Sequence, residues 1–391
     1  MQSPPVVQWT EGGSTRTARW RSERGAPPPK RVEIADDTLT ADAAYGLAAQ
    51  GTAFLWRGDF QNARQMQNAL ASRADRPARR AQRHATAPPA PAPLGTPAMA
   101  AAFHLHRQAR SQRARTLGTL LIELDADYRI ALRRAPDLAP ACGEAYGPAD
   151  GPSLVSLREL LGLVGAHEWR SRGIDIPAAG GRIHPHYGVF APVRREYVDL
   201  VAQAPLPAAL RAMDLAFDIG TGTGVLAAVL AARGVGRVIA TDMDPRALAC
   251  ARENVERLGR RDTVEIVAAD LFPEGRAALV VCNPPWIPAR PSSPLEHGIY
   301  DPESRMLRAY LAGLATHLVP GGEGWLVLSD LAEHLGLRTR AELAAWIEAA
   351  GLQVLARHDV RPVHPKAADA SDPLHAARAA EVTSLWRLAV R

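Results

Sequence analysis

The sequence predicts an α/β protein: a mostly parallel sheet with helices on both faces, preceded by a mainly helical N-terminal region. Three observations support this. From Ala216 onward, short apolar runs alternate with amphipathic segments, as in strands joined by crossover helices. A glycine-rich turn follows the first run, and an Asn-Pro-Pro-Trp sequence follows the fourth. Before Gly188, the apolar residues recur mainly at helical spacing.

The length and composition allow a large domain together with a smaller one. The chain has 391 residues, a mass of 42.0 kDa and 47% hydrophobic residues. Its formal charge is +5 and its pI about 9.4. This mild basic excess allows acidic partners without requiring them.

The cysteines and the hydropathy pattern predict a soluble protein of the cytoplasm. Cys142, Cys250 and Cys282 are odd in number and widely spaced, which matches neither a disulfide framework nor a zinc cluster. Such cysteine usage fits a reducing compartment. No stretch approaches the roughly 20 apolar residues that a membrane helix needs, so no membrane partner is expected.

Residues 1–37 are expected to form a disordered tail, because they are rich in Pro, Gly, Ser and charge and show no sustained hydrophobic period. Residues 38–180 are expected to form a mainly helical, arginine-rich domain. The apolar spacing on either side of Gly58 predicts two helices, the first of them starting after Thr40.

An Ala/Pro tract near 84–102 is expected to be a linker, because its composition cannot support a packed core. The arginines of the basic helix that follows allow two interpretations, a phosphate-contacting surface or a solvated helix face. No aromatic residues are interleaved to stack on bases, which favours the second. These arginines are Arg107, Arg110, Arg113 and Arg115.

Two further segments lead toward the sheet. Leucines from Leu154 to Leu163 recur at helical spacing and predict a helix over 153–164. His184 and His186 flank a proline in a strand and turn ahead of a helix at 194–204. No Cys, Asp or Glu stands nearby at metal-ligand spacing, so a structural or substrate-lining role is expected for both histidines.

Seven strands are predicted in the second half, most of them separated by helices. The strands are expected at 216–219, 237–241, 264–268, 278–282, 324–328, 352–358 and 382–390, and the helices at 225–233, 245–258, 307–318 and 340–350. In such sheets, ligands bind at the carboxyl ends of the strands. The motifs of the chain fall at this edge.

A glycine-rich turn follows the first predicted strand. Gly220, Gly222 and Gly224 allow a sharp turn and the close approach of a ligand, and the next helix offers free N–H groups. The order Asp218-x-Gly-x-Gly-x-Gly departs from the G-x-G-x-x-G dinucleotide fingerprint. An acidic residue ahead of the glycines suits a ligand with a positively charged amino acid end better than a pyrophosphate.

Acidic residues follow the second and third predicted strands. Asp242 ends the second strand, where a carboxylate can accept hydrogen bonds from both ribose hydroxyls. Asp244 is either a substitute for it or the N-cap of the helix that starts at Pro245, and the strand pattern favours Asp242. Asp270 either meets an adenine amino group or is an exposed loop acid.

Asn283-Pro284-Pro285-Trp286 follows the fourth predicted strand, at the same edge as the glycines. The prolines stiffen the loop and remove N–H donors. The Asn283 side-chain oxygen and the Pro284 carbonyl can then hold the two hydrogens of an –NH2 group, and the flat Trp286 can stack on its plane. These residues predict a slot for a planar nitrogen group.

With these motifs the chain resembles the class I S-adenosylmethionine-dependent methyltransferases, in the N-P-P-[YFW] branch with a methyltransferase small domain. That branch includes the release-factor glutamine methyltransferases and the amino-base methyltransferases of nucleic acid. The resemblance covers 188–391 and implies a Rossmann-like fold and S-adenosyl-L-methionine as cofactor. It implies that Asp218 and the three glycines hold the methionine part, Asp242 the ribose and Asp270 the adenine.

The resemblance also implies the reaction, which is methyl transfer to a planar amide or amine nitrogen. Asn283 and Pro284 would grip this nitrogen with Trp286 against its plane, and no metal is implied. A protein glutamine, in a substrate of release-factor or ribosomal type, is slightly preferred. An exocyclic amine of rRNA or other nucleic acid is the alternative, motivated by the arginine-rich first half. A non-catalytic binding module is the third hypothesis, against which the intact glycines argue.

Overall fold

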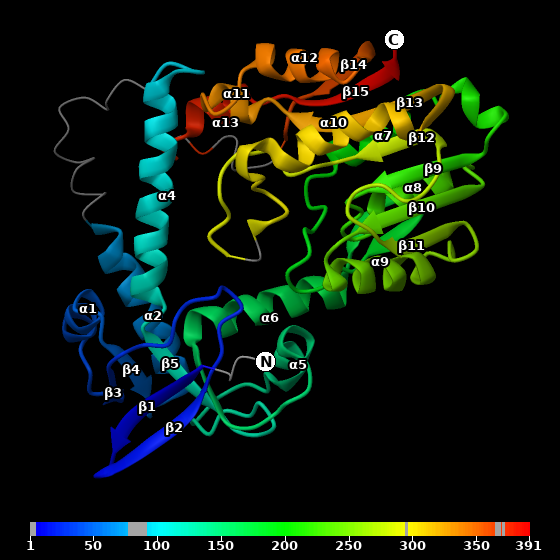
Figure 1. Cartoon of the computed structure of the whole chain (residues 1–391). Helices are drawn as coiled ribbons and strands as arrows, with labels where there is room; N and C mark the ends of the chain where they lie inside the picture. The colour runs from blue at the N-terminus through cyan, green and yellow to red at the C-terminus, as the bar shows by residue number, and fades with distance from the viewer. Residues whose placement is uncertain (1–4, 77–91, 294–295, 364–368, 370–371) are drawn as a thin grey trace. The chain divides into compact units, whose positions relative to one another are not determined.

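The computed structural model describes residues 5–76, 92–293, 296–363, 369 and 372–391 (Figure 1). The chain divides into two compact units. The first comprises Met1–Ala90 and Leu105–Glu168, and the second comprises Pro91–His104 and Trp169–Arg391.

A seven-stranded sheet forms the centre of the second unit. The strands are β9 (Leu215–Ile219), β10 (Arg237–Asp242), β11 (Val264–Ala268), β12 (Ala277–Cys282), β13 (Leu318–Ser329), β14 (Leu352–Val360) and β15 (Thr383–Val390). Their order is β11-β10-β9-β12-β13-β15-β14, and β15 runs in the direction opposite to the other six strands. The chain order reverses beside β9, so the ends of β9 and β12 form the point at which such sheets bind ligands.

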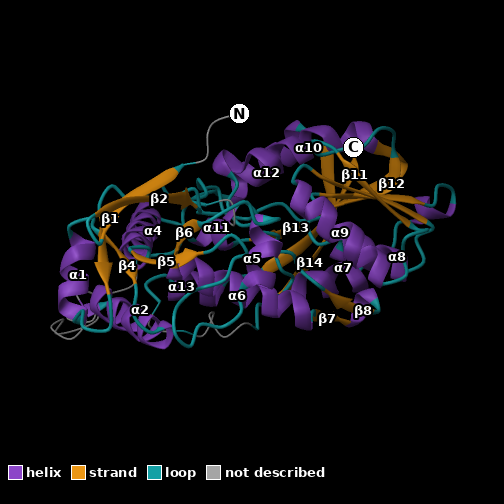
Figure 2. Cartoon of the chain, turned by 90° about the horizontal axis from the view of Figure 1, so that it is seen from below, coloured by secondary structure: helices purple, strands orange, loops and turns teal. Residues whose placement is uncertain are grey.

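Helices cover both faces of this sheet (Figure 2). Successive side chains of β9 point to opposite faces, so the strand packs against helices on each of them. Ala216 packs in a core with α8, and Phe217 packs in another core with α10. The helices of the unit are α7 (Glu196–Gln203), α8 (Val225–Ala232), α9 (Pro245–Arg257), α10 (Arg305–His317), α11 (Leu331–His334), α12 (Arg340–Ala349) and α13 (His375–Ala380). The predicted α/β class is therefore confirmed.

A six-stranded sheet occupies the first unit, in the order β1-β2-β6-β5-β4-β3. The strands are β1 (Val6–Glu11), β2 (Ser14–Trp20), β3 (Val32–Ala35), β4 (Ala53–Trp56), β5 (Leu120–Leu124) and β6 (Ser153–Ser156). The helices are α1 (Ala41–Ala49), α2 (Phe60–Ala74), α4 (Pro97–Leu117), α5 (Ala139–Tyr146) and α6 (Leu157–Arg172), and the division between the units falls within α4 and α6. A small hairpin of β7 (Ile174–Ile176) and β8 (Gly181–Ile183) follows.

Two predictions for the N-terminal part of the chain, a disordered tail over 1–37 and a mainly helical domain over 38–180, miss the strands of this sheet. The expected tail contributes three strands, because Val7, Trp9 and Trp20 bury apolar side chains in a common core. The segments of β4 and β6 were expected within helices. Each is a four-residue strand, and its apolar run is too short for periodicity to distinguish a strand from a helix.

The predicted linker near 84–102 is replaced at its end by a helix. Residues 84–91 lie outside the described residues. From Pro97 the chain forms α4, and Met99 and Phe103 are buried against residues of α11 and α13. The alanines of this tract therefore belong in part to a helix with a packed face.

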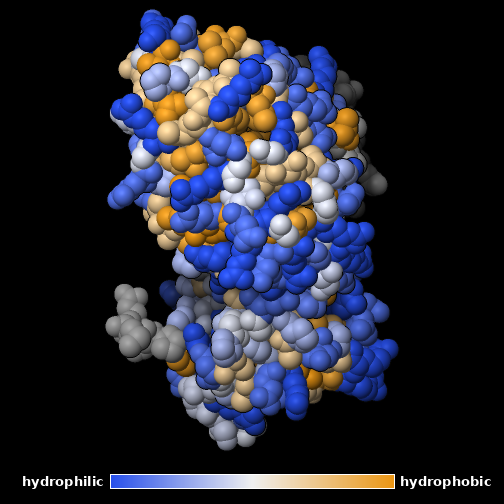
Figure 3. Space-filling view, turned by 90° about the vertical axis from the view of Figure 1, so that its right-hand side faces the viewer, coloured by the Kyte–Doolittle hydropathy of each residue, from blue (hydrophilic) through white to orange (hydrophobic). Residues whose placement is uncertain are grey.

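The described helices include none whose length and hydropathy would suit a bilayer span. Figure 3 shows one face of the molecule, on which hydrophilic side chains predominate and apolar ones lie in scattered groups.

The packing of α10 against the sheet yields a stability prediction. Leu314 of α10 is fully buried in the core cluster that also contains Phe217 of β9. Leu314→Ala should therefore lower the free energy of unfolding by about 2–5 kcal/mol. The control Leu355→Ala changes a half-exposed residue of β14 and should cost at most about 0.5 kcal/mol. Urea unfolding of both variants measures the difference, and equal midpoints would contradict this account of the core.

Candidate functional site

The glycine turn after β9 rests on the end of β10. Thr221 donates its backbone N–H to the Thr241 carbonyl at 2.8 Å, and Gly222 donates its N–H to Asp242 Oδ2 at 3.0 Å. Gly224 has a φ of +80°, and a Cβ there would lie 3.2 Å from the Ala251 backbone in α9. Glycine is required at this position for both reasons.

Asp218 lies beneath the turn and is almost fully buried. Its Oδ2 accepts hydrogen bonds from Thr221 Oγ1 at 2.6 Å and from the Ala227 N–H in α8 at 3.0 Å. Burial raises the pKa of Asp218 to about 6; these two bonds oppose the rise and the nearby Asp242 adds to it. The carboxyl group therefore connects β9, the turn and the first turn of α8.

The two carboxylates that follow β10 have different roles in the structure. Asp242 accepts the Gly222 N–H on one oxygen and the Asp244 N–H on the other, each at 3.0 Å. Asp244 caps α9 by accepting the Arg246 N–H at 2.8 Å. Asp244 is thus the N-cap, and Asp242 is the carboxylate that faces the glycine turn.

Asp270 lies two residues beyond β11 and is exposed. The residues on either side of it are tied to the end of β10. Ala269 donates its N–H to the Asp242 carbonyl at 3.2 Å, and Thr241 Oγ1 donates to the Leu271 carbonyl at 2.5 Å. Asp270 therefore shares the edge of the sheet with Asp242.

The Asn283-Pro284-Pro285-Trp286 loop leaves β12 directly beside the glycine turn, because Cys282 pairs with Ile219 of β9. Pro284 is buried, whereas Asn283 and Trp286 are partly exposed. Trp286 Nε1–H donates to Asn283 Oδ1 at 2.9 Å. This hydrogen bond within the motif was not predicted from the sequence.

An arginine that was not among the predicted site residues lies against Trp286. The guanidinium of Arg194 is 5.2 Å from the centre of the indole ring, and Tyr197 meets the same indole edge-on at 6.5 Å. Arg194 donates to Glu196 and to Glu381, which comes just before β15. The only hint in the sequence was the position of Arg194 just ahead of α7.

The histidine segment has structural partners. His184 donates its backbone N–H to Asn254 Oδ1 at 2.7 Å, and Asn254 Nδ2 donates to the Thr223 carbonyl of the glycine turn at 3.0 Å. His186 Nε2 lies 2.6 Å from Glu253 Oε2. Asn254 of α9 therefore connects the histidine segment to the glycine turn. A polar residue on the buried face of a predicted helix is the signal in the sequence that could have indicated this role. Among the described residues, no group of three or more His, Cys, Asp or Glu is arranged to hold a metal ion.

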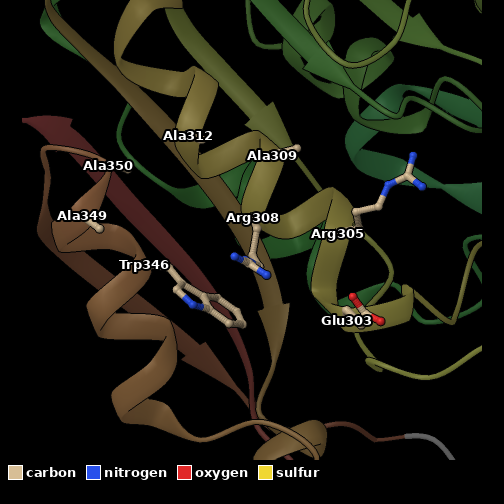
Figure 4. A pocket seen from close by; sticks show the side chains of 8 residues that line it. All are labelled: Glu303, Arg305, Arg308, Ala309, Ala312, Trp346, Ala349 and Ala350. Carbon is tan, nitrogen blue, oxygen red and sulfur yellow. The ribbon is translucent and has the colours of Figure 1, made fainter.

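A hollow of about 550 Å³ lies apart from these motifs, between α10 and α12 (Figure 4). The guanidinium of Arg308 lies 5.5 Å from the centre of the Trp346 ring, and both residues line the hollow. None of the motif residues lines this hollow. The candidate site is therefore assigned to the motif residues at the carboxyl ends of β9, β10 and β12.

Residues 181–342 match the family described as the methyltransferase small domain. A release factor glutamine methyltransferase of Cereibacter sphaeroides is 36% identical over 150 residues, which are 34% of this chain and 51% of that protein. Its counterpart from Deinococcus radiodurans is 35% identical over 156 residues, 37% of this chain and 53% of that protein. A ribosomal protein L11 methyltransferase of Pelotomaculum thermopropionicum is 49% identical over 69 residues, 17% of this chain and 22% of that protein.

These matches confirm the predicted resemblance to the class I methyltransferases, whose methyl donor is S-adenosyl-L-methionine. The chain spans about half the length of the release-factor relatives that it matches.

The burial of Asp218 predicts a pH dependence of stability. The ordinary pKa of an aspartate carboxyl group is 3.8, and that of Asp218 in the folded protein is about 6. Between these values the folded state binds more protons, so ionisation of Asp218 lowers the free energy of unfolding as pH rises, by up to about 3 kcal/mol. Asp218→Asn should remove this contribution. Urea unfolding of both proteins at pH 4 to 7 measures the difference, and parallel profiles would contradict the raised pKa.

Proposed function

We propose that this chain, whose residues 181–342 match the methyltransferase small domain, is an S-adenosyl-L-methionine-dependent N-methyltransferase. Its acceptor is a planar amide or amine nitrogen, with a protein glutamine slightly preferred. The observation that carries the proposal is the position of the Asn283 loop. It leaves β12 beside the glycine turn of β9, at the point where the strand order reverses.

The cofactor would be held along the ends of β9, β10 and β11. Asp218 with Gly220, Gly222 and Gly224 would hold the methionine part, Asp242 the ribose and Asp270 the adenine. In support, each Asp242 oxygen is oriented by one backbone N–H and retains further lone pairs for ribose hydroxyls.

The cofactor supplies an activated methyl group on a sulfonium, so the protein needs little acid or base chemistry. Asn283 Oδ1 and the Pro284 carbonyl would accept the two hydrogens of the acceptor –NH2, which fixes the direction of its lone pair. Positive charge would develop on nitrogen as the methyl group passes from the cofactor's sulfur, which leaves as a neutral thioether, and these two acceptors would stabilise that charge until the nitrogen loses one proton to solvent. Trp286 would pack against the plane of the acceptor.

The class of acceptor is proposed from the relatives. Relatives matched over 150 residues or more include two release-factor glutamine methyltransferases and a ribosomal protein L11 methyltransferase, which favours a protein acceptor of release-factor or ribosomal type. An exocyclic amine of nucleic acid is the second candidate, because Arg110 and Arg115 are exposed on α4. Arg113 of the same helix is engaged by Asp75 at 2.7 Å, which reduces the surface available to phosphates. The buried free cysteines fit a reducing compartment such as the cytoplasm.

Labelled methyl transfer tests the proposed reaction. Wild type with tritiated S-adenosyl-L-methionine should label the protein fraction of a lysate from cells that lack this protein. Asn283→Ala should lower the rate at least about 100-fold, because one of the two nitrogen clamps is lost. The control Asn68→Ala changes an exposed asparagine of α2 and should retain the rate. Label in RNA or DNA would favour the second candidate, and no Asn283-dependent label would overturn the proposal.

The two carboxylates after β10 provide a test of the cofactor site. Asp242→Ala should weaken S-adenosyl-L-methionine binding at least about 100-fold, since two hydrogen bonds to a charged group are lost. Asp244→Ala should lower stability by about 1 kcal/mol through loss of the helix cap and leave affinity near that of wild type. Isothermal titration calorimetry measures both affinities. Equal losses in the two variants would contradict the distinction between them.

A further inference from the structure

We infer that Arg194 is a positioning residue of the acceptor slot: it fixes the indole of Trp286, and the indole in turn sets the orientation of the Asn283 side-chain amide. The catalytic consequence rests on the proposed function. The geometric part does not, because it concerns contacts within the chain alone.

The first step is the hydrogen bond between the two motif residues. An indole N–H can only donate, and an amide has an accepting oxygen at one end and a donating –NH2 at the other. Trp286 Nε1–H, 2.9 Å from Asn283 Oδ1, therefore selects one of the two amide orientations. In the other orientation two donors would face each other. The selected oxygen keeps a second lone pair, which the acceptor nitrogen needs.

The second step is the placement of the indole itself. Trp286 is partly exposed and lies in a loop, so its ring orientation depends on its neighbours. Arg194 covers the ring at 5.2 Å from its centre, and Tyr197, itself buried, meets it at 89°. A cation over an indole face is the strongest of the cation–π pairs that side chains form.

The third step is the anchoring of Arg194. Its Nε–H donates to Glu196 Oε1 at 2.8 Å, and both terminal nitrogens donate to Glu381 Oε1 at 3.1 Å. Both carboxylates are more than nine-tenths buried. Glu381 is also held by Ser329 Oγ–H, at the end of β13, at 2.7 Å.

This anchoring explains why the position suits arginine. A planar guanidinium can bond two carboxylates through its edge while its face covers an indole, whereas a lysine ammonium has no such plane. The orientation of Arg194 is therefore determined by Glu196, two residues along the chain, and by Glu381, 187 residues away, and Trp286 packs against a fixed surface.

The exchange rate of the Trp286 indole hydrogen with solvent tests the inference directly. The chain contains eight tryptophans, and Trp286→Phe identifies the Trp286 signal in a nitrogen–proton spectrum of the indole groups. Arg194→Met should speed the exchange of this hydrogen at least about tenfold. The control Arg308→Met removes the equivalent cation from Trp346, in the hollow of Figure 4, and should leave the Trp286 signal unchanged.

The kinetics distinguish positioning from general stabilisation. With the acceptor fraction labelled by wild type, Arg194→Met should lower kcat about tenfold, and its Kd for S-adenosyl-L-methionine should stay within about twofold of wild type. Arg194→Lys keeps the positive charge without the planar guanidinium, so its kcat should lie between those of Arg194→Met and wild type. An unchanged indole exchange rate in folded Arg194→Met would overturn the inference.

Two further outcomes are decided by the same design. If Arg194→Met does not fold because Glu381 is left unpaired, the double variant Arg194→Met/Glu381→Gln removes both charges, and the same acceleration of exchange is expected. If wild type transfers no methyl group, the proposed function fails. The indole exchange rates still support or overturn the positioning role.

Discussion

The attachment of the glycine turn to the end of β10 is the contact on which the rest of the candidate site depends. Two backbone N–H groups, of Thr221 and Gly222, bond to Thr241 and Asp242. The turn can reach them only because its glycines adopt positive φ and because Gly224 leaves room for α9. The buried Asp218 connects the same turn to α8 from below. One set of contacts thus shapes the turn and orients the carboxylate proposed for the ribose.

The loop proposed to bind the acceptor is held by side chains instead of backbone hydrogen bonds. Its motif residues lie in a proline-stiffened loop, but the orientation of Trp286 comes from a buried ion-pair cluster outside the motif. A buried cluster of this kind adds little net stability, because the removal of charges from water is costly. Its benefit is a defined geometry, since the guanidinium can satisfy both carboxylates in few orientations. The edge proposed for the cofactor relies on backbone hydrogen bonds, and the loop proposed for the acceptor relies on charged side chains.

The sequence allowed the strands of the second unit, the edge on which the motif residues lie and several helices of the first unit to be predicted, but not the sheet of the first unit. The strands and the motif residues were identifiable because each motif directly follows an apolar strand, so sequence order alone assigns Asp242 and Asn283 to one edge. Arg194 and Glu381 are 187 residues apart, and nothing local marks either as a partner of the other. In the first unit, β4 and β6 are four-residue strands whose apolar runs are too short for their period to be recognised. The tail was expected to be disordered because it is rich in Pro, Gly, Ser and charge, and its few buried apolar residues alternate with exposed ones in the short strand β1.

The position of β15 in the sheet has a consequence for biosynthesis. This strand lies between β13 and β14, although it follows both in the sequence, and Glu381 comes just before it. During translation, the parallel strands β9 to β13 and the glycine turn can emerge and pair before β15 has been synthesised. The strand ends and glycine turn proposed for the cofactor can therefore form on the nascent chain. Arg194 lacks its Glu381 partner until the sheet is completed. In this order of assembly, a chain that stops short of β15 would keep the proposed cofactor edge and lack an organised acceptor slot.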